Sequence, residues 1–426
     1  MMETLILTVF LIGYFFMAIE HVIEVNKAAI SLITGILCWT IYIILYHEHH
    51  QVVEHLLHHI GEISGILFFL LGAMTIVEII DAHSGFEIIT NRIKFKNKRT
   101  LLISVSLLSF FLSALLDNLT TAIVMVTLLR KLLSDANDRK IFLGMVIIAS
   151  NAGGAWSPIG DVTTTMLWIG EQLTSETVIF RVFIPALICL LVPLFLLSFR
   201  IRGEISKNSF SEYSHHAASP KETRYVLFMS MAILVFVPLF KTITHLPPYM
   251  GMLLGLSVLW IITDVMHKRK QEEEKSYFSV SYAIRKTDVP SILFFLGILL
   301  SISALQSTGQ LHSLAMFLHK NLPNENLIVL SIGLLSALVD NVPMVAGAMG
   351  MYDLATFPTD HTFWTFLAYS AGTGGSSLII GSAAGVAVMG MEKISFGWYL
   401  KNIALYALIG FFSGAGVYLL QMWLVS

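Results

Sequence analysis

The sequence has few charged residues and few cysteines, and each shortage excludes a class of protein. Charged residues fill 13% of the 426 positions, about half of the roughly 25% that is usual in soluble domains. The two cysteines, Cys38 and Cys189, lie inside apolar runs, so neither a disulfide framework nor a cysteine-based metal site is expected. Polar stretches between the apolar runs are too short to form a soluble domain. Soluble enzymes and disulfide-stabilised secreted domains are therefore excluded.

Apolar residues dominate instead, at 56% of the chain with a mean hydropathy of +0.77. A membrane-spanning helix needs about 20 mostly apolar residues, and such runs recur from residue 5 to residue 424. We expect an all-α, polytopic membrane protein whose main partner is the lipid bilayer, with no nucleic-acid partner. The ordinary spans are predicted at 5–20, 28–46, 60–80, 177–199, 224–241, 249–266, 289–307 and 397–424.

Two apolar segments differ from these spans because each carries an Asp-Asn pair near its middle. The segment 100–133 has 34 residues. As one helix it would extend about 50 Å, against a hydrocarbon core of about 30 Å. A break at Asp117 and Asn118 would leave two arms of about half the membrane thickness, as in a re-entrant hairpin. The segment 326–352 repeats this pattern around Asp340 and Asn341, so we predict a hairpin in each segment.

The basic residues support the two hairpins. Both ends of a re-entrant hairpin lie on one side of the membrane, and Lys and Arg are enriched on the cytoplasmic side. With both hairpins in place, 23 of the 26 Lys and Arg residues lie in the cytoplasm, and both chain termini lie outside. The exceptions are Arg181, Lys241 and Lys320, whereas the first hairpin is flanked by Arg92, Lys94, Lys96, Lys98, Arg99, Arg130, Lys131, Arg139 and Lys140.

Each half of the chain then contains five full spans and one hairpin, and this odd number inverts the second half relative to the first. The motif at 113–118 matches that at 336–341 in five of six positions. Three glycines recur at a similar spacing, because Gly153, Gly154 and Gly160 correspond to Gly374, Gly375 and Gly381. We predict two inverted-topology repeats, 1–200 and 223–426, joined by a cytoplasmic linker at 201–222.

The acidic residues inside the hairpins need an explanation, because an Asp at the bilayer centre costs about 2.5 to 3.5 kcal/mol. A carboxylate at a half-helix end, beside an Asn carbonyl, offers oxygen ligands to Na⁺ or Li⁺, and the same carboxylate can bind a proton instead. Asp117, Asn118, Asp340 and Asn341 are therefore candidates for binding the transported cation or proton. The structural alternative is that each Asp only caps a broken helix.

The apolar segments that follow the hairpins, 141–168 and 363–391, are rich in small residues. Gly and Pro at this density predict broken helices with unwound centres, where free carbonyls and half-helix ends build the ion sites of transporters. The side-chain ligands available there are those of Asn151, Asp161, Thr163, Thr164, Thr373, Ser376 and Ser377. For the small residues, close helix packing is the alternative explanation. Asp161 is harder to explain by packing.

Further titratable residues lie in or beside the predicted span 60–80. Glu62, near its outer end, is a candidate proton relay, and Glu78, near its inner end, is either a relay or an interfacial residue. Six histidines are predicted to lie in an external loop, where they would bind metal, sense pH or be incidental. They are His47, His49, His50, His55, His58 and His59.

Three long motifs resemble those of the NhaD-type sodium/proton antiporters of the ion transporter superfamily. They are Ser-Ala-Leu-Leu-Asp-Asn-Leu-Thr-Thr (113–121), Ser-Asn-Ala-Gly-Gly-Ala-Trp-Ser-Pro-Ile-Gly-Asp (150–161) and Ser-Ala-Leu-Val-Asp-Asn-Val-Pro (336–343). The resemblance implies a secondary transporter, not an enzyme, that exchanges Na⁺ or Li⁺ for protons across a bacterial inner membrane, with no cofactor besides these ions. A homodimer is left open.

The same resemblance implies which residues form the ion pathway. They are Asp117, Asn118, Asp161, Thr163, Thr164, Asp340 and Asn341, with Asn151 at a matching polar position. Na⁺ would be held at Asp117, Asp161 and Asp340, together with neighbouring backbone carbonyls. The counterpart of Asp161 in the second half is Ser382, so the carboxylates are arranged asymmetrically. We expect alternating access, with Asp117 and Asp340 approaching one another near the midplane and with Na⁺ and protons competing for the aspartates.

Two other functions remain open at this point. A carboxylate or oxyanion carrier of the same superfamily would have neutral Ser-Asn-Thr hairpin tips, whereas acidic tips repel anions and attract cations. An arsenite carrier is not excluded by this argument. An intramembrane aspartyl protease would also need two aspartates in the membrane, but its Gly-x-Gly-Asp motif is missing from the sequence.

Overall fold

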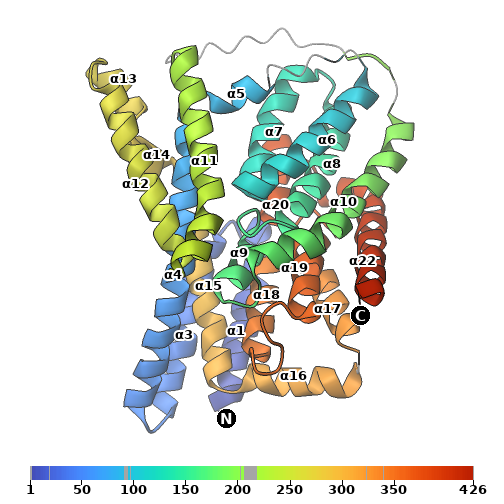
Figure 1. Ribbon diagram of the computed structural model, residues 1–426. Helices are drawn as coiled ribbons and strands as arrows, with labels where there is room; N and C mark the ends of the chain where they lie inside the picture. The colour runs from blue at the N-terminus through green and yellow to red at the C-terminus, as the bar shows by residue number, and fades with distance from the viewer. Residues whose placement is uncertain are drawn as a thin grey trace.

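The protein is helical throughout the computed structural model in Figure 1. The structure describes residues 2–425 except 19, 91–94, 96, 202, 206–217, 323 and 339. These described residues form no β-strand, and the pairing of Asn97 with Glu204 is an isolated bridge. The predicted all-α class is confirmed. Arg92, Lys94 and Lys96 of the basic flank, and most of the predicted linker 201–222, lie outside the described residues.

Eight helical segments in the described part of the chain are long and apolar enough to cross a membrane. They are α3 (Lys27–Leu45), α4 (His49–Ala82), α6 (Lys98–Leu116), α10 (Ser175–Arg200), α11 (Pro220–Thr244), α12 (Pro248–His267), α15 (Val289–Ser307) and Phe396–Leu424. Large apolar side chains stay exposed on them, including Phe180 (77%), Ile243 (75%) and Val265 (70%). Lipid accounts for such a surface. The chain is a multi-pass membrane protein, as predicted.

The remaining helices fall into two sets. Helix α1 (Met2–Ala18) packs along α3. Short helices near the ends of the long ones are α2 (Glu20–Ile23), α5 (Gly85–Thr90), α13 (Glu272–Tyr277), α14 (Val280–Lys286), α16 (Gln310–Asn321) and α21 (Phe396–Tyr399). Helix α21 continues through a π-helical turn, η2 (Leu400–Ala404), into α22 (Leu405–Val425). The interior ones are α7 (Asn118–Leu132), α8 (Ala136–Ala155), α9 (Val162–Ile169), α17 (Glu325–Leu335), α18 (Asn341–Met351), α19 (Thr362–Gly374), η1 (Gly375–Ser377) and α20 (Ala383–Glu392).

Local sequence signals set several helix ends. Helix α11 begins with a capping box, in which the Ser219 hydroxyl accepts from the Glu222 N–H and the Glu222 carboxylate accepts from the Ser219 N–H. Pro220 occupies the first helical position, where no N–H is needed. The helix ends where His245 adopts a left-handed conformation with φ of 59°. The sequence thus fixes both ends of this helix independently of tertiary packing.

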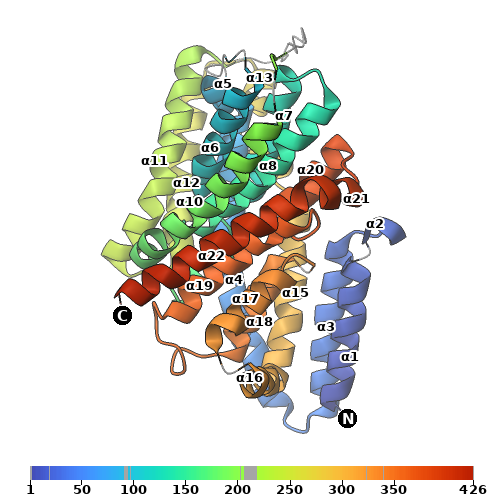
Figure 2. The same cartoon turned by 90° about the vertical axis from the view of Figure 1, so that its right-hand side faces the viewer.

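The helices pack in two groups. One, called the outer group here, consists of α1, α3, α4, α11, α12 and α15, which contact one another extensively. The other, called the site group, consists of α6 to α10 and α17 to α22. Figure 2 shows α22 crossing the front of the molecule beside α10 in the site group, with α1 and α3 at the right-hand edge. Helices from both halves of the chain contribute to each group.

Four helix interruptions lie inside the site group. Helix α6 ends at Leu116 and α7 begins at Asn118, so Asp117 is the residue at the break. With 19 residues, α6 is longer than the predicted half-membrane arm and is itself long enough to cross a membrane. Asp340 immediately precedes α18 in the same way. The chain between α8 and α9, and between α19 and α20, is also interrupted. In Figure 1, α6 and α7 lie in the upper half of the molecule and α17 and α18 in the lower half.

Packing contacts recur around the two hairpin segments. A Cβ added to Gly153 would lie 2.1 Å from the Phe110 carbonyl oxygen, and one added to Gly374 would lie 2.0 Å from the Gly333 carbonyl oxygen. The Ser113 hydroxyl donates to the Ser150 carbonyl at 2.6 Å. Ser336, its sequence counterpart, donates to the Ala371 carbonyl at 3.2 Å. Helices α6 and α8 therefore approach each other as α17 and α19 do.

The histidine cluster differs from the prediction. Five of the six histidines, all except His47, lie on α4, which begins at His49 instead of near residue 60. The helix extends this far because apolar residues continue at helical spacing through the histidine-rich stretch. Val52 is buried and Leu56 packs against the core. The assignment of these five residues to a loop was wrong.

Candidate cation site

The backbone at Asp117 is strained. Its φ of 113° and ψ of 163° lie in a region that is nearly restricted to glycine. The side chain caps α7, because its Oδ1 accepts from the Thr120 N–H at 2.7 Å and its Oδ2 from the Thr120 hydroxyl at 2.8 Å. Strain of this kind costs about 1 to 3 kcal/mol and is concentrated at functional sites. The break therefore keeps the Asp117 carboxylate at its tip although the backbone conformation there is unfavourable for an aspartate.

Asn118 begins a chain of buried amides and hydroxyls. Its Nδ2 donates to Asn151 Oδ1 at 3.0 Å. Asn151 Nδ2 in turn donates to the hydroxyls of Ser376 and Ser382, both at 2.9 Å. All four side chains are at most 4% exposed. The hydrogen bonds therefore connect the first hairpin segment, through α8, to the interruption between α19 and α20.

Asp161 is a buried carboxylate at the interruption between α8 and α9. It is 2% exposed, and its Oδ2 accepts from the Thr163 hydroxyl at 3.0 Å and from Asn341 Nδ2 at 3.2 Å. Both donors are neutral, and no Lys, Arg or His among the described residues forms an ion pair with it. A buried charge without a partner is strongly unfavourable. This carboxylate therefore needs a proton or a cation.

Asp161 and Ser382 occupy corresponding positions, and the difference between them is informative. Each is the N-cap residue of its helix with nearly the same backbone, φ of −146° and −148° respectively. The Ser382 hydroxyl caps α20 by accepting from the Gly385 N–H at 3.2 Å. The Asp161 side chain makes no cap hydrogen bond and is directed to Thr163 and Asn341 instead. Asp161 therefore does not cap its helix, whereas Ser382 does.

Asp340 lies at the break in the second segment predicted as a hairpin, in a different environment. Its Oδ1 accepts from the Val342 N–H at 3.3 Å and its Oδ2 lies 3.6 Å from Lys27 Nζ. A cavity of about 60 Å³ borders it, lined by Tyr14, Met17, Glu20, Lys27, Phe294, Leu338, Ile380 and Val386. Asp340 is therefore the hairpin aspartate that has a cationic partner among the described residues.

The other candidate residues divide by their hydrogen bonds. The Thr164 hydroxyl donates to the Ala155 carbonyl at 3.4 Å and the Thr373 hydroxyl to the Tyr369 carbonyl at 2.6 Å. These two side chains thus satisfy the backbone near the breaks. The Ser377 hydroxyl is buried and has no hydrogen-bond partner among the described residues. The Ser377 oxygen therefore remains available to bind a cation.

No group of three or more His, Cys, Asp or Glu side chains in the described part of the chain is placed to hold a metal ion. Asp117, Asp161 and Asp340 lie at separate breaks, but both hairpin aspartates are near enough to Asp161 to interact with it electrostatically. The groups that hydrogen-bond to the Asp161 carboxylate are neutral, so a cation bound there would contact one carboxylate and neutral oxygen ligands directly. Such a donor set suits a monovalent ion better than a divalent one, because a single carboxylate balances a single charge.

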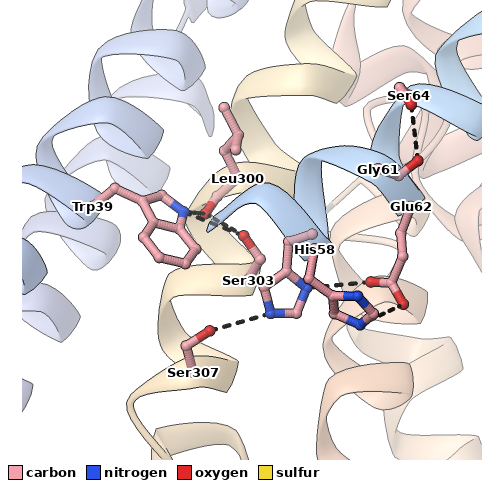
Figure 3. Close-up of polar contacts among 9 residues, drawn as sticks. Trp39, His58, Gly61, Glu62, Ser64, Leu300, Ser303 and Ser307 are labelled. Atoms are coloured by element: carbon pink, nitrogen blue, oxygen red, sulfur yellow. Dashed lines mark hydrogen bonds and ion pairs between the residues drawn. The ribbon is translucent and has the colours of Figure 1, made fainter. Parts of the chain in front are cut away.

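Glu62 forms a separate polar group with two histidines, which Figure 3 shows. Its side chain is 60% exposed and pairs with His58 at 3.5 Å and with His59 at 3.2 Å. The other ring nitrogen of His59 lies 3.1 Å from the Ser307 hydroxyl, so the group joins α4 to α15. Glu78 is half-buried on α4. The relay role of Glu62 stays a prediction.

Sequence reasoning missed two residues of the site. Thr120 binds the Asp117 carboxylate, and its position in the Asp-Asn-Leu-Thr motif was the available signal. Lys27 pairs with Asp340, and the signal was a lysine directly before an apolar run. The predicted approach of Asp117 to Asp340 stays a prediction.

Comparison with known proteins identifies the family. The citrate transporter (CitMHS) family model matches residues 4–366. Two proteins of Arabidopsis thaliana, sodium/proton antiporter 1 and sodium/proton antiporter 2, are 47% identical over 408 residues and 45% identical over 410. Each match covers 96% of this chain, with 70% of the first protein and 97% of the second.

A bacterial relative, the Na⁺/H⁺ antiporter NhaD of Vibrio parahaemolyticus, is 29% identical over 399 residues, covering 86% of this chain and 93% of that protein. The matches extend over nearly the whole molecule and include both hairpin segments. The chain therefore belongs to the CitMHS family of membrane transporters, together with the NhaD-type sodium/proton antiporters, and is a secondary transporter and not an enzyme.

Proposed function

We propose that this protein exchanges Na⁺ or Li⁺ for protons across the membrane. The observation that carries the proposal is the Asp161 carboxylate, which is 2% exposed and contacts only neutral donors, the Thr163 hydroxyl and the Asn341 amide. The names of the relatives, sodium/proton antiporter and Na⁺/H⁺ antiporter, support Na⁺ and H⁺ as the two exchanged ions. Na⁺, Li⁺ and H⁺ are the substrates, and no further cofactor is part of the proposal.

The coupling follows from the cost of an uncompensated buried charge. An ionised Asp161 without a counter-ion costs several kcal/mol in a low-dielectric site. The site therefore changes the side of the membrane that it faces with either a proton or a cation bound to Asp161. The ionised form of Asp161 without a bound ion is rarely populated. Competition of Na⁺ and H⁺ for one carboxylate then links the two fluxes. The Thr163 hydroxyl and backbone carbonyls at the break complete the oxygen shell around a cation.

Alternating access requires that the site face each side in turn. The recurring contacts of Gly153 and Gly374, and of Ser113 and Ser336, support two repeats at 1–200 and 223–426. In the proposed mechanism the site group moves against the outer group, carrying both hairpins. The cytoplasmic side is assigned by the Lys and Arg distribution. A bacterial inner membrane stays an expectation, because the relatives include plant proteins.

The description of the family model raises citrate as a second candidate substrate. A citrate site needs cationic side chains to offset its carboxylates. In the described part of the chain, Lys27 is the one basic residue that reaches the aspartates of the site, and it is paired with Asp340. Asp117 and Asp161 would repel an anion. The geometry therefore favours a cation over citrate.

The test is a flux assay in vesicles with an imposed pH gradient. Na⁺ or Li⁺ is expected to dissipate the gradient in the wild type, whereas citrate and arsenite are not. In Asp161→Asn the exchange should fall by roughly tenfold or more, because a neutral amide can neither release a proton nor balance a cation. Asp353→Asn, at an exposed turn, is the matched control and should exchange normally. Full exchange by Asp161→Asn, or a response to citrate alone, would reject the proposal.

A further inference from the structure

The contact between Lys27 and Asp340 joins the two helix groups. Lys27 is the first residue of α3 in the outer group, and Asp340 precedes α18 in the site group. Lys27 Nζ lies 3.6 Å from Asp340 Oδ2 and 4.6 Å from the centre of the Phe294 ring. The side chains are 24% and 18% exposed, so the pair is partly shielded from solvent. An ion pair in such surroundings is screened less than one at the surface.

The helix itself gives no reason for a lysine at this position. A positive side chain in the first turn of a helix opposes the helix dipole, which favours acidic residues there. Glu20 supplies that favourable charge, because its Oε2 accepts from the Lys27 N–H at 3.2 Å. The Lys27 ammonium is directed instead toward the Asp340 carboxylate and the Phe294 ring. Its role is therefore to be sought at Asp340.

The surrounding cavity fits small inorganic cations. Its volume is about 60 Å³, which is room for a few water molecules or a small hydrated cation. Its lining includes two carboxylates, Glu20 and Asp340, and one ammonium, Lys27. The Asp340 carboxylate of this lining pairs with the Lys27 ammonium. A cation that enters must then share Asp340 with Lys27 or displace it.

On this basis we infer that Lys27 is a tethered competitor for the transported cation at Asp340, and that it sets the cation affinity of this cavity. The inference rests on the proposed cation exchange. When no cation is bound in the cavity, the Lys27 ammonium pairs with the Asp340 carboxylate and links the site group to the outer group. When Na⁺ binds Asp340, the pair separates and this ionic contact between the groups is lost, while the packing of α15 against α18 remains. Lys27 is thus an affinity-determining residue and not itself a ligand of the cation.

The test compares Na⁺ dependence in four proteins reconstituted in vesicles. Lys27→Met keeps the length of the side chain and removes its charge, whereas Lys27→Arg keeps the charge. The half-saturating Na⁺ concentration should fall by roughly threefold to tenfold in Lys27→Met and stay near the wild-type value in Lys27→Arg. Lys98→Met, which breaks a similarly shielded pair with Asp138 at 2.6 Å, is the matched control and should leave it unchanged.

A second measurement does not depend on transport. Na⁺-dependent thermal stabilisation of the purified protein reports binding directly, since a ligand raises stability according to its concentration and affinity. Lys27→Met should increase this Na⁺ response, and the increase should vanish when Asp340→Asn is added. An equal increase in the Asp340→Asn background, or none in Lys27→Met, overturns the inference while Na⁺ exchange by the wild type stands. No Na⁺ exchange in the wild type would instead reject the proposed function.

Discussion

At Asp117 the backbone and the side chain act on stability in opposite directions. The strained φ of 113° costs about 1 to 3 kcal/mol, whereas an Asp cap at a helix start contributes about 0.5 to 2 kcal/mol relative to Ala. Glycine would remove the strain and lose only a few tenths of a kcal/mol of capping relative to Asp. The strain is the larger quantity. Asp at position 117 therefore makes the protein less stable than Gly would, which points to a functional reason for the carboxylate.

Asp117→Gly is accordingly expected to be as stable as the wild type or more stable by about 1 kcal/mol, while cation exchange is lost. Asp117→Ala keeps a Cβ in the strained conformation and removes the cap, so it should be the least stable of the three proteins. Thermal unfolding in detergent, together with the flux assay, measures both properties. A Tm for Asp117→Gly below that for Asp117→Ala would contradict the strain argument.

Part of the site could be inferred from single residues, and part could not. A carboxylate in an apolar segment is conspicuous in any sequence, which is why Asp117, Asp161 and Asp340 were candidates. The partners of these groups depend on tertiary packing. Asn341 reaches Asp161 across the two halves, and Lys27 reaches Asp340 from another helix group. No periodicity or motif spacing encodes such contacts.

At the scale of helices, two close crossings determine the shape of the site group. Gly153 lets α8 approach the Phe110 carbonyl on α6, and Gly374 lets α19 approach the Gly333 carbonyl on α17. In both cases the obstacle to a side chain is a backbone oxygen, which cannot move aside as a flexible side chain does. The crossings bring the interruptions of α8 and α19 beside the hairpin breaks. Small residues are used in this way where helices approach closely in membranes.

Gly153→Ala and Gly374→Ala are each expected to destabilise the protein by about 1 to 3 kcal/mol, as overpacking does. Gly416→Ala is the control, because nothing lies within 4 Å of an added Cβ in α22 and alanine favours a helix. It should be neutral or slightly stabilising. Unfolding in detergent compares the three variants. A neutral Gly374→Ala beside a costly Gly153→Ala would argue against equivalent crossings in the two halves.

Helix boundaries show which sequence signals were reliable. The uniform apolar runs gave the long helices, for example 289–307, which coincides with α15. The start of α4 was misplaced because polar histidines hid the continuing helical spacing of Val52 and Leu56. Hydropathy alone does not detect a helix that extends past the apolar run. To predict a helix end made of mixed polar and apolar residues, one needs to know what the end packs against, and the sequence does not show this.

At the scale of the whole molecule, the proposed mechanism depends on hairpins that open to opposite faces. Helices α6 and α7 lie at one end of the molecule in Figure 1 and α17 and α18 at the other, which supports such an arrangement. Each helix group also contains elements from both halves of the chain. Motion of one group against the other would then expose the breaks to each side in turn, as repeat-based transporters require.

Sidedness can be tested with cysteines in the two connecting loops. Asn137 is exposed where α8 begins beside the first hairpin, and Ala355 is exposed in the loop after α18. The native Cys38 and Cys189 are buried, so they contribute little labelling in the folded protein. In sealed right-side-out vesicles, a membrane-impermeant maleimide should label Ala355→Cys and reach Asn137→Cys only after permeabilisation, because the basic flanks place that end in the cytoplasm. Inverted vesicles should give the opposite pattern. Labelling of both positions from the same side would show that the hairpins open to one face, and the inverted-repeat mechanism would then fail.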